Sequence, residues 1–246
     1  MSGIQLSFSQ TLQELEAART LMRDFLENGQ AIIPELKSQL QSLRQGSLNI
    51  LDWEVQKSRP LRTVISKGES EPGGGGAHLV GHLSFLWRIE RLRERRAREP
   101  SKLFRVLGKA STVARIFEVG AGGSTLEELA MWRMEVGDDD SPGCHFHVQI
   151  RGEGGNPFPS TLSVPRFPGC LPTPLAALEF LIAEIFQDSW KHHVAVESDE
   201  LKRWRSIQKS RFSRLLDWQR SIVGSESASP LAALKMAKPK PELFLE

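Results

Sequence analysis

Cysteine is scarce in this sequence, long apolar runs are absent, and neither sign of charge dominates. Two cysteines, Cys144 and Cys170, are too few for a disulfide framework and are typical of a reducing compartment. Because no segment has the apolar length of a membrane span or the pattern of a signal peptide, we expect a cytoplasmic protein without a membrane partner. A formal net charge of +2 excludes the broadly basic surface of a nucleic-acid coat protein, although local basic patches remain compatible with it.

The first fifty residues have the apolar spacing of helices. In residues 9–28, Leu12, Leu15 and Ala18 recur at helical intervals, and Gly29 follows as a stop signal. The spacing predicts a second helix over residues 33–45, with Pro34 in its first turn and Gly46 at its end. Residues 1–50 are therefore predicted to form an N-terminal helical hairpin.

From Leu61 the apolar period changes to that of β-strands. The alternation is clearest over residues 79–90, where Leu83, Phe85 and Trp87 share one face and His82 lies on the other. The remaining predicted strands are residues 61–67, 103–107, 113–119, the two arms of a hairpin within 129–151, and an edge strand at 161–167. The connections are too short for crossover helices, so we expect an α+β protein with an antiparallel β-meander of about five to six strands.

Two helices are predicted after the strands. The first covers residues 174–190, with Thr173 as its N-cap and Pro174 at its first position, and its broad apolar face should cover the sheet. The second covers residues 198–223. We therefore predict a core domain at residues 51–224 and a flexible tail at 225–246.

The segment 129–151 predicts a hairpin whose two faces differ chemically. If residues 137–143 connect the arms and Val136 lies opposite Cys144, then Met134 faces Phe146, Trp132 faces Val148 and Ala130 faces Ile150, and all eight apolar residues are buried together. The same register places Glu135 opposite His145 and Arg133 opposite His147. Gln149 and Arg151 continue this polar face, which is the most plausible place for chemistry or binding.

His145 and His147 are candidate metal ligands, because residues two apart on a strand project from the same face. With Glu135 they suggest a divalent metal site and metal-assisted hydrolase or nuclease activity. A metal-free polar pocket, in which Glu135 fixes the tautomer of His145, is a second interpretation. A third is a purely structural polar face, because two ligands without an identified third are a weak signal.

The glycine-rich sequence FEVGAGGS at residues 117–124 resembles the first motif of class I methyltransferases. That resemblance implies backbone amides that hold S-adenosylmethionine at the start of a helix. The residues that follow depart from the family pattern, because an alternating strand resumes near Trp132, where the family continues with a helix. The motif therefore favours a turn between two strands.

Basic residues cluster in two places. Five arginines lie within residues 91–98, and the last long helix carries Arg203, Arg211 and Arg214 beside an apolar stripe that contains Trp204 and Trp218. We expect the stripe to dock while these three arginines stay available to a partner, so that replacing all three should leave the fold nearly intact. Such a surface is suited to an acidic protein or to nucleic acid.

Three functions remain open at this point. The preferred one is a non-enzymatic binding or scaffold protein with a protein partner in a cytoplasmic assembly, for which Arg133, Gln149, Arg151 and the helical arginines are the candidate binding residues. The alternatives are a metal-assisted hydrolase that uses His145, His147 and Glu135, and a nucleic-acid-binding protein that uses the basic helix.

Overall fold

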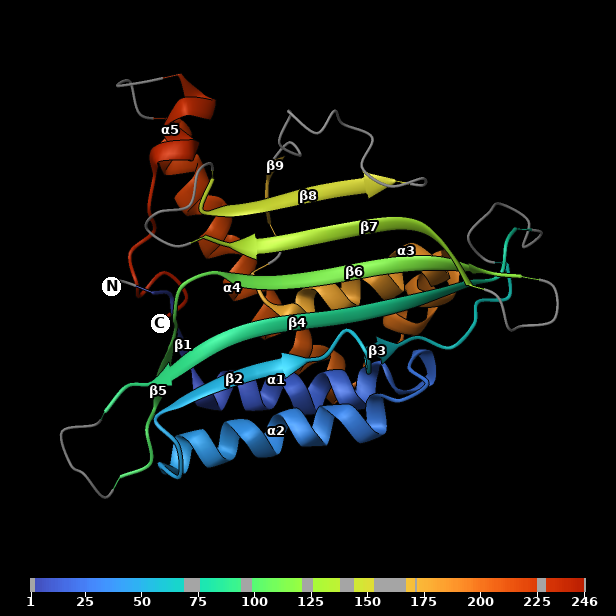
Figure 1. Ribbon diagram of the computed structural model, residues 1–246, viewed down its shortest axis with the longest axis horizontal. Coiled ribbons are helices and arrows are strands. Elements are labelled where there is room, and N and C mark those ends of the chain that lie inside the picture. Colours follow the sequence, from blue (N-terminus) through green and yellow to red (C-terminus); the bar gives the residue numbers. More distant parts are fainter. Residues whose placement is uncertain are drawn as a thin grey trace.

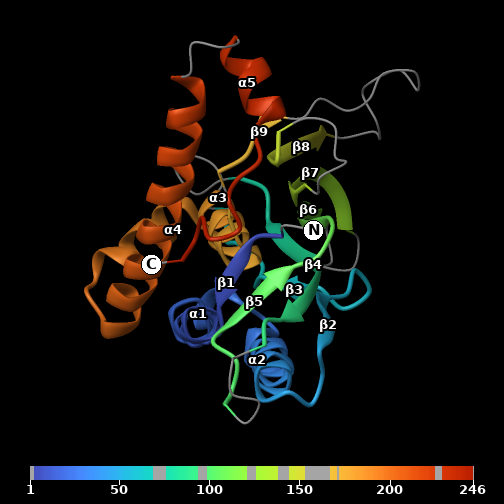
Figure 2. The same ribbon diagram turned by 90° about the vertical axis from the view of Figure 1, so that its left-hand side faces the viewer.

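The computed structural model describes residues 3–68, 76–93, 99–120, 126–137, 144–152, 167–170, 172–224 and 229–245. These residues form an antiparallel sheet covered on one side by helices, as the sequence predicts for an α+β protein (Figure 1). Viewed along the sheet, the helices lie in one layer and the strands in another (Figure 2).

The sheet has nine strands in the described residues, more than the five to six predicted. In chain order they are β1 (Gln5–Ser7), β2 (Ile50–Val55), β3 (Leu61–Arg62), β4 (Leu79–Arg91), β5 (Leu103–Val106), β6 (Ala110–Val119), β7 (Leu126–Val136), β8 (Phe146–Gly152) and β9 (Phe167–Pro168). Their spatial order is β1-β5-β4-β6-β7-β8-β9, and β2 and β3 pair with β4. Two of these strands, β1 and β2, were not predicted from the sequence. Of the predicted edge strand at 161–167, residues 161–166 lie outside the described part of the chain.

The predicted strand over residues 61–67 ends after two residues because side-chain hydroxyls take over the pairing with β4. The Gly81 amide donates to Thr63 Oγ1 at 2.9 Å, and the Leu79 amide donates to Ser66 Oγ at 2.9 Å. Serine and threonine hydroxyls offer the backbone such an alternative to a regular ladder. The segment therefore follows β4 without continuing as a strand.

The helices are α1 (Phe8–Leu21), α2 (Gly29–Gln45), α3 (Pro174–Ala195), α4 (Asp199–Val223) and α5 (Pro230–Met236), with a short 3-10 helix η1 (Arg23–Phe25). The predicted N-cap of α3 is confirmed, since Thr173 Oγ1 accepts from the Ala176 amide. The α2 helix begins at Gly29, four residues earlier than predicted, so Pro34 lies inside it. In the described part of the chain, no helix combines the length and the apolar character needed to cross a membrane.

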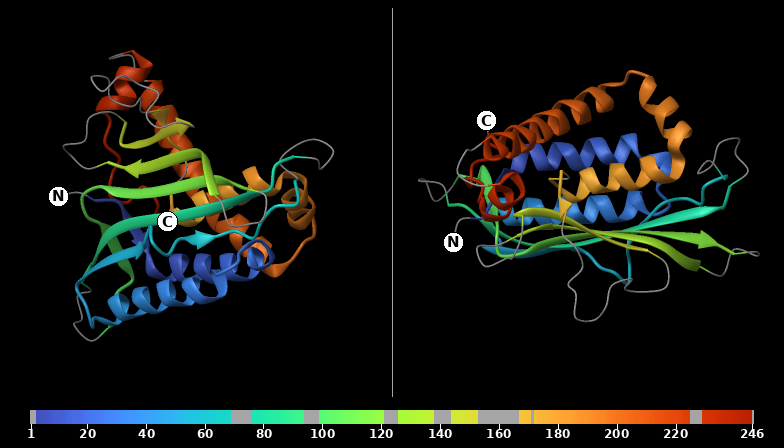
Figure 3. Two further views of the ribbon diagram at one scale, coloured as in Figure 1. Left: turned by 45° about the vertical axis from the view of Figure 1, so that its right-hand side comes forward. Right: turned by 90° about the horizontal axis from the view of Figure 1, so that it is seen from above.

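The helical layer packs closely on the centre of the sheet (Figure 3). Gly81 on β4 permits this approach, because a Cβ atom there would lie 2.6 Å from Ile185 Cδ1 and 2.9 Å from Leu181 Cγ on α3. The core continues under α2, where Trp53 of β2 packs edge-on against Phe85 of β4 with ring centroids 5.0 Å apart. The predicted alternation of β4 is thus confirmed: its odd-numbered residues face the helices.

A tail free of the body was predicted for residues 225–246, but residues 229–245 pack against it. Phe244 is only 2% exposed, and its ring lies 5.9 Å from that of Phe146. The Gln5 amide donates to the Pro241 carbonyl oxygen at 2.8 Å. A single aromatic residue in a polar segment gives no periodic signal, which is why the sequence did not reveal this docking.

Candidate functional site

The β7–β8 hairpin forms, but its register differs from the predicted one by two residues. Val136 pairs with Phe146, Glu135 with His147, and Arg133 with Gln149. Pairing starts at Phe146 because Cys144 and His145 belong to the connection, which the Gly137 amide closes by donating to the His145 carbonyl oxygen at 2.6 Å. A shift of two residues leaves every side chain on its predicted face. The predicted pairs Glu135–His145 and Met134–Phe146 are therefore wrong, while the division into two faces is correct for the residues within the strands.

The apolar face of the hairpin was expected to be buried along its whole length, but part of it is exposed. Phe146 packs against Trp218 of α4, with ring centroids 5.8 Å apart, and Trp132 packs edge-on against Phe180 of α3 at 5.6 Å. Ile150, by contrast, remains 47% exposed. The reason is its position near the edge of the sheet, because α3 packs mainly over β4 and β6.

His147 is held by acceptors at both ring nitrogens. Its Nε2 lies 2.9 Å from Glu135 Oε2, and its Nδ1 lies 2.9 Å from the Cys144 carbonyl oxygen. A carbonyl oxygen only accepts, so Nδ1 donates to Cys144, while Nε2 contacts the Glu135 carboxylate. The side chain is also buried. His147 is therefore a structural link between the two strands, with neither nitrogen directed at a ligand.

The structure places His147, and not His145, directly opposite Glu135. His145 precedes β8, and its ring lies edge-on to that of Phe146, with ring centroids 5.2 Å apart. Across the described ranges, no three side chains of His, Cys, Asp or Glu lie close enough together to bind a metal ion.

The side of the sheet opposite the helices, called the open face below, has no described helix packed on it (Figure 3). Its residues form rows across neighbouring strands. One row is Ser84, Val113, Arg133 and Gln149, and the row beside it is Arg62, His82, Arg115, Met131 and Arg151. Two predicted binding residues, Arg133 and Gln149, are thus direct cross-strand partners. Arg151 occupies the position opposite Met131 on β7.

A hollow of about 260 Å³ lies on the open face over β4, β6 and β7. Its polar lining includes Ser84, Ser111, Arg115 and Arg133, with Lys57 and Glu54 at the β2 side. Arg115 forms an ion pair with Glu128 at 3.2 Å. Arg133 differs: within the described residues its guanidinium has no hydrogen bond or ion pair, and its Nε is fully buried.

His82, which lies on the open face, has a shifted pKa. Burial lowers the pKa of His82, and the nearby positive charges of Arg62 and Arg115 lower it further, while Glu27 acts in the opposite direction. Its ring is tilted against that of Phe117, with ring centroids 4.6 Å apart. A positive charge at His82 is therefore unfavourable.

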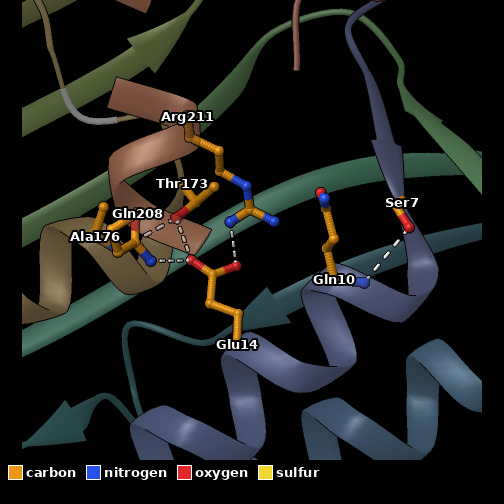
Figure 4. A network of polar contacts seen from close by, with 7 residues as sticks. All are labelled: Ser7, Gln10, Glu14, Thr173, Ala176, Gln208 and Arg211. Atoms are coloured by element: carbon orange, nitrogen blue, oxygen red, sulfur yellow. Dashed lines mark hydrogen bonds and ion pairs between the residues drawn. The ribbon is translucent and has the colours of Figure 1, made fainter. Parts of the chain in front are cut away.

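Only part of the predicted basic surface of α4 is exposed in the folded protein. Arg211 is buried, with a side chain only 2% exposed, and pairs with Glu14 of α1 (Figure 4). Arg214 is half-buried and donates to the Leu245 carbonyl oxygen. Arg203 is the one member of the predicted trio that is exposed. The expectation that all three stay available to a partner is wrong, and replacement of Arg211 is now predicted to destabilise the fold.

The Glu14 carboxylate is satisfied from two more sides. Thr173 Oγ1 donates to Glu14 Oε1 at 2.9 Å, and Gln208 Nε2 donates to the same oxygen at 2.7 Å (Figure 4). A sequence signal for Arg211 existed, because it lies seven residues after Trp204 and therefore in the buried stripe of α4. This network joins the first helix of the chain to the last long one.

Of the second basic cluster, at residues 91–98, the structure describes Arg91 and Arg93. Arg91 donates to Asn49 Oδ1 at 2.8 Å. Arg95, Arg96 and Arg98 lie outside the described residues.

The methyltransferase resemblance is not accompanied by that family's architecture. The strand that holds Phe117 is followed by β7, which starts at Leu126 and runs antiparallel to β6. A strand stands where the family has a helix. Residues 121–124 of the motif lie outside the described part of the chain.

No protein-family model matches this chain, and no curated protein or solved structure is significantly similar to it. The function of this chain is therefore inferred from the geometry of its own residues.

Proposed function

We propose that this chain is a non-enzymatic binding protein of a cytoplasmic assembly and that it holds a protein partner on the open face of its sheet. The observation that carries the proposal is the state of Arg133. It is a cation with a buried Nε and no counter-charge among the described residues, beside a hollow large enough for a small anionic group.

A partly buried charge without a partner is unfavourable, because the group loses hydration and gains no compensating contact. A cation of this kind beside a hollow is a candidate for a binding site. Two acidic side chains of the open face are engaged elsewhere: Glu128 pairs with Arg115, and Glu135 pairs with His147. An acidic group of a partner would supply the missing counter-charge to Arg133.

The open face also offers apolar contact area. Leu86 on β4 lines the hollow and is 50% exposed. Interfaces between proteins that associate reversibly combine such apolar contacts with arginine-mediated polar ones. Leu86 and Arg133 together therefore favour binding over catalysis.

Site-specific photo-cross-linking tests this proposal. A benzophenone side chain placed at Leu86 should cross-link to a discrete partner in the cells that make the protein. The matched control is the same side chain at Leu216 on α4, which is 51% exposed and lies on the helical layer. We expect the cross-link at position 86 only, and we expect Arg133→Glu to abolish it.

Two results would contradict the proposal. One is equal cross-linking from positions 86 and 216, which would indicate non-specific contact. The other is cross-linking from position 216 alone, which would move the binding surface to α4. Recovery of nucleic acid in place of protein at position 86 would favour the nucleic-acid alternative.

A further inference from the structure

We infer that the hollow on the open face is a phosphate-binding site and that it recognises a phosphorylated side chain of the partner. This inference rests on the proposed function, since it names the chemistry of the group that the open face holds. The evidence is the arrangement of donors around Val113, the absence of internal partners for those donors, and the balance of charge.

Val113 forms the floor of the site. On β6 its neighbours on the same face are Ser111 and Arg115, and across the adjacent strands it faces Ser84 on β4 and Arg133 on β7. Adjacent strands lie about 4.8 Å apart and same-face residues of one strand about 7 Å apart, so the four side chains surround the valine at similar distances. An anion above Val113 would be within reach of hydroxyl and guanidinium donors from four directions.

These donors are largely unused by the rest of the protein. Within the described residues, the side chains of Arg133, Ser84, Ser111 and Lys57 form no hydrogen bond or ion pair. Buried and half-buried polar groups are normally satisfied, either by the protein or by something bound to it. Of these donors, the Nε of Arg133 is fully buried without a partner, and the others line the hollow, where a ligand rich in acceptors would meet them.

The donors around Val113 suit a phosphate monoester better than a carboxylate. Arg133 and Arg115 flank the valine, Glu128 pairs with Arg115 alone, and a phosphate monoester carries about −1.5 to −2 at neutral pH. Its three terminal oxygens can accept from donors on several sides, whereas a planar carboxylate offers two oxygens. Arginine also pairs with phosphate through two parallel hydrogen bonds.

The one carboxylate that lines the hollow is remote from its cationic side. Glu54 lies on β2, three strands from Arg133, which corresponds to about 14 Å of sheet. It also accepts a hydrogen bond from Gln56 Nε2 at 3.0 Å. Glu54 thus borders the site without neutralising Arg133.

A phosphate on a protein fits the surroundings better than a free one. Leu86 lies beside Ser111 in the next row of the open face and presents an exposed apolar side chain. Residues that flank a phosphorylated side chain would contact it, whereas a free phosphate ion would gain nothing from it. This contact is the basis for distinguishing the two sources.

Fluorescence anisotropy provides the test, with a labelled peptide pool that has a central phosphoserine between randomised flanks and a matched pool that has serine. We expect the phosphoserine pool to bind at least about tenfold more tightly. Arg133→Met should weaken binding at least about tenfold, and Arg133→Lys should weaken it less. Arg220→Met, at an exposed arginine of α4, should leave it unchanged. Circular dichroism of each variant shows whether it is folded.

Three outcomes would overturn the inference: equal binding of both pools, phosphoserine binding that Arg133→Met leaves intact in a folded protein, and inorganic phosphate that displaces the pool at concentrations equal to that of the peptide. The last would assign the site to free phosphate. The cross-link from position 86 separates this inference from the proposed function. If the cross-link still forms after phosphatase treatment of the partner, then binding does not require the phosphate, although the open face is the binding surface.

Discussion

Two arginines, one on each side of this protein, show how differently a fold can treat the same side chain. Arg211 lies in the helical layer, where Glu14 neutralises it and Thr173 and Gln208 satisfy the remaining lone pairs of the carboxylate. Arg133 lies on the open face, where the described residues offer it no counter-charge. The first arrangement joins α1 to α4 and pairs each charge with its opposite, although the Nε and Nη2 of Arg211 have no hydrogen-bond partner among the described residues. The second is incomplete without a ligand.

The contrast indicates which charges belong to stability and which to function. A buried pair whose partners lie 197 residues apart in the chain exists only in the folded protein, so breaking it should affect folding. An unpaired cation on an open sheet contributes little to folding and much to recognition. The following predictions test that division, from the largest expected effect to the smallest.

Arg211→Met should lower the free energy of unfolding by about 3 to 5 kcal/mol, because it leaves the Glu14 carboxylate buried without a counter-charge. Urea denaturation measures the loss. The double variant Glu14→Leu, Arg211→Met should recover much of it, since both charges are then removed. A loss below about 1 kcal/mol for the single variant would mean that Arg211 contributes no more to stability than a surface charge does.

Phe146→Ala should cost about 3 kcal/mol, because it removes a buried ring that contacts both α4 and the C-terminal segment. The matched control is Ile150→Ala on the same strand and face, which should cost less than about 1 kcal/mol because Ile150 is half-exposed. Comparable losses in denaturant melts would mean that the edge of the sheet is as well covered as its centre.

His147→Leu should cost about 2 kcal/mol, since it removes the hydrogen bond to Glu135 and leaves the Cys144 carbonyl oxygen without its donor. Glu135→Gln should cost less, because an amide oxygen can still accept from the ring. The two variants are compared by chemical denaturation. A larger loss for Glu135→Gln would show that its carboxylate has a role beyond the contact with His147.

Arg133→Met should leave the free energy of unfolding unchanged within about 0.5 kcal/mol or raise it, because it removes a cation whose guanidinium makes no internal interaction. Thermal melts beside Arg211→Met make the comparison directly. Similar destabilisation of the two variants would contradict the division between structural and functional arginines.

The smallest effect concerns pH. Because burial and the charges of Arg62 and Arg115 lower the pKa of His82, the folded protein favours its neutral form. Its contribution to stability is complete above the unfolded pKa of about 6.5 and is lost as the pH falls below that value, where the unfolded chain binds the proton more readily. His82→Gln should therefore flatten the decline of the denaturation midpoint on the acidic side. An unchanged acid profile would refute this assignment.

The two residues at the centre of the candidate site differ in how far the sequence could reveal them. Alternation along residues 129–151 placed Arg133 on the polar face of a strand, and that prediction needed no knowledge of pairing. It could not show that Arg133 lacks a counter-charge, because the neighbours that decide this come from β4 and β6. Ser84, Ser111 and Val113 were accordingly missed as site residues.

The His145 and His147 predictions show a different limit. Both histidines were placed on one face with Glu135, but the start of β8 at Phe146 moved His145 into the connection and brought His147 opposite Glu135. Strand alternation is insensitive to a shift of two residues, so no local pattern could choose between the registers. This shift is why His147, and not His145, is the cross-strand partner of Glu135.

The sequence by itself determined the local features: which segments are helices or strands, which face of each is apolar, and where α3 begins. These follow from interactions between residues a few positions apart, and their periods of 2 and 3.6 can be recognised without a structure. Only the tertiary structure decided the β7–β8 register, the docking of Phe244, the burial of Arg211 and the isolation of Arg133. Each depends on contacts between distant parts of the chain, where the free energy of the whole fold selects among local arrangements that are equally acceptable.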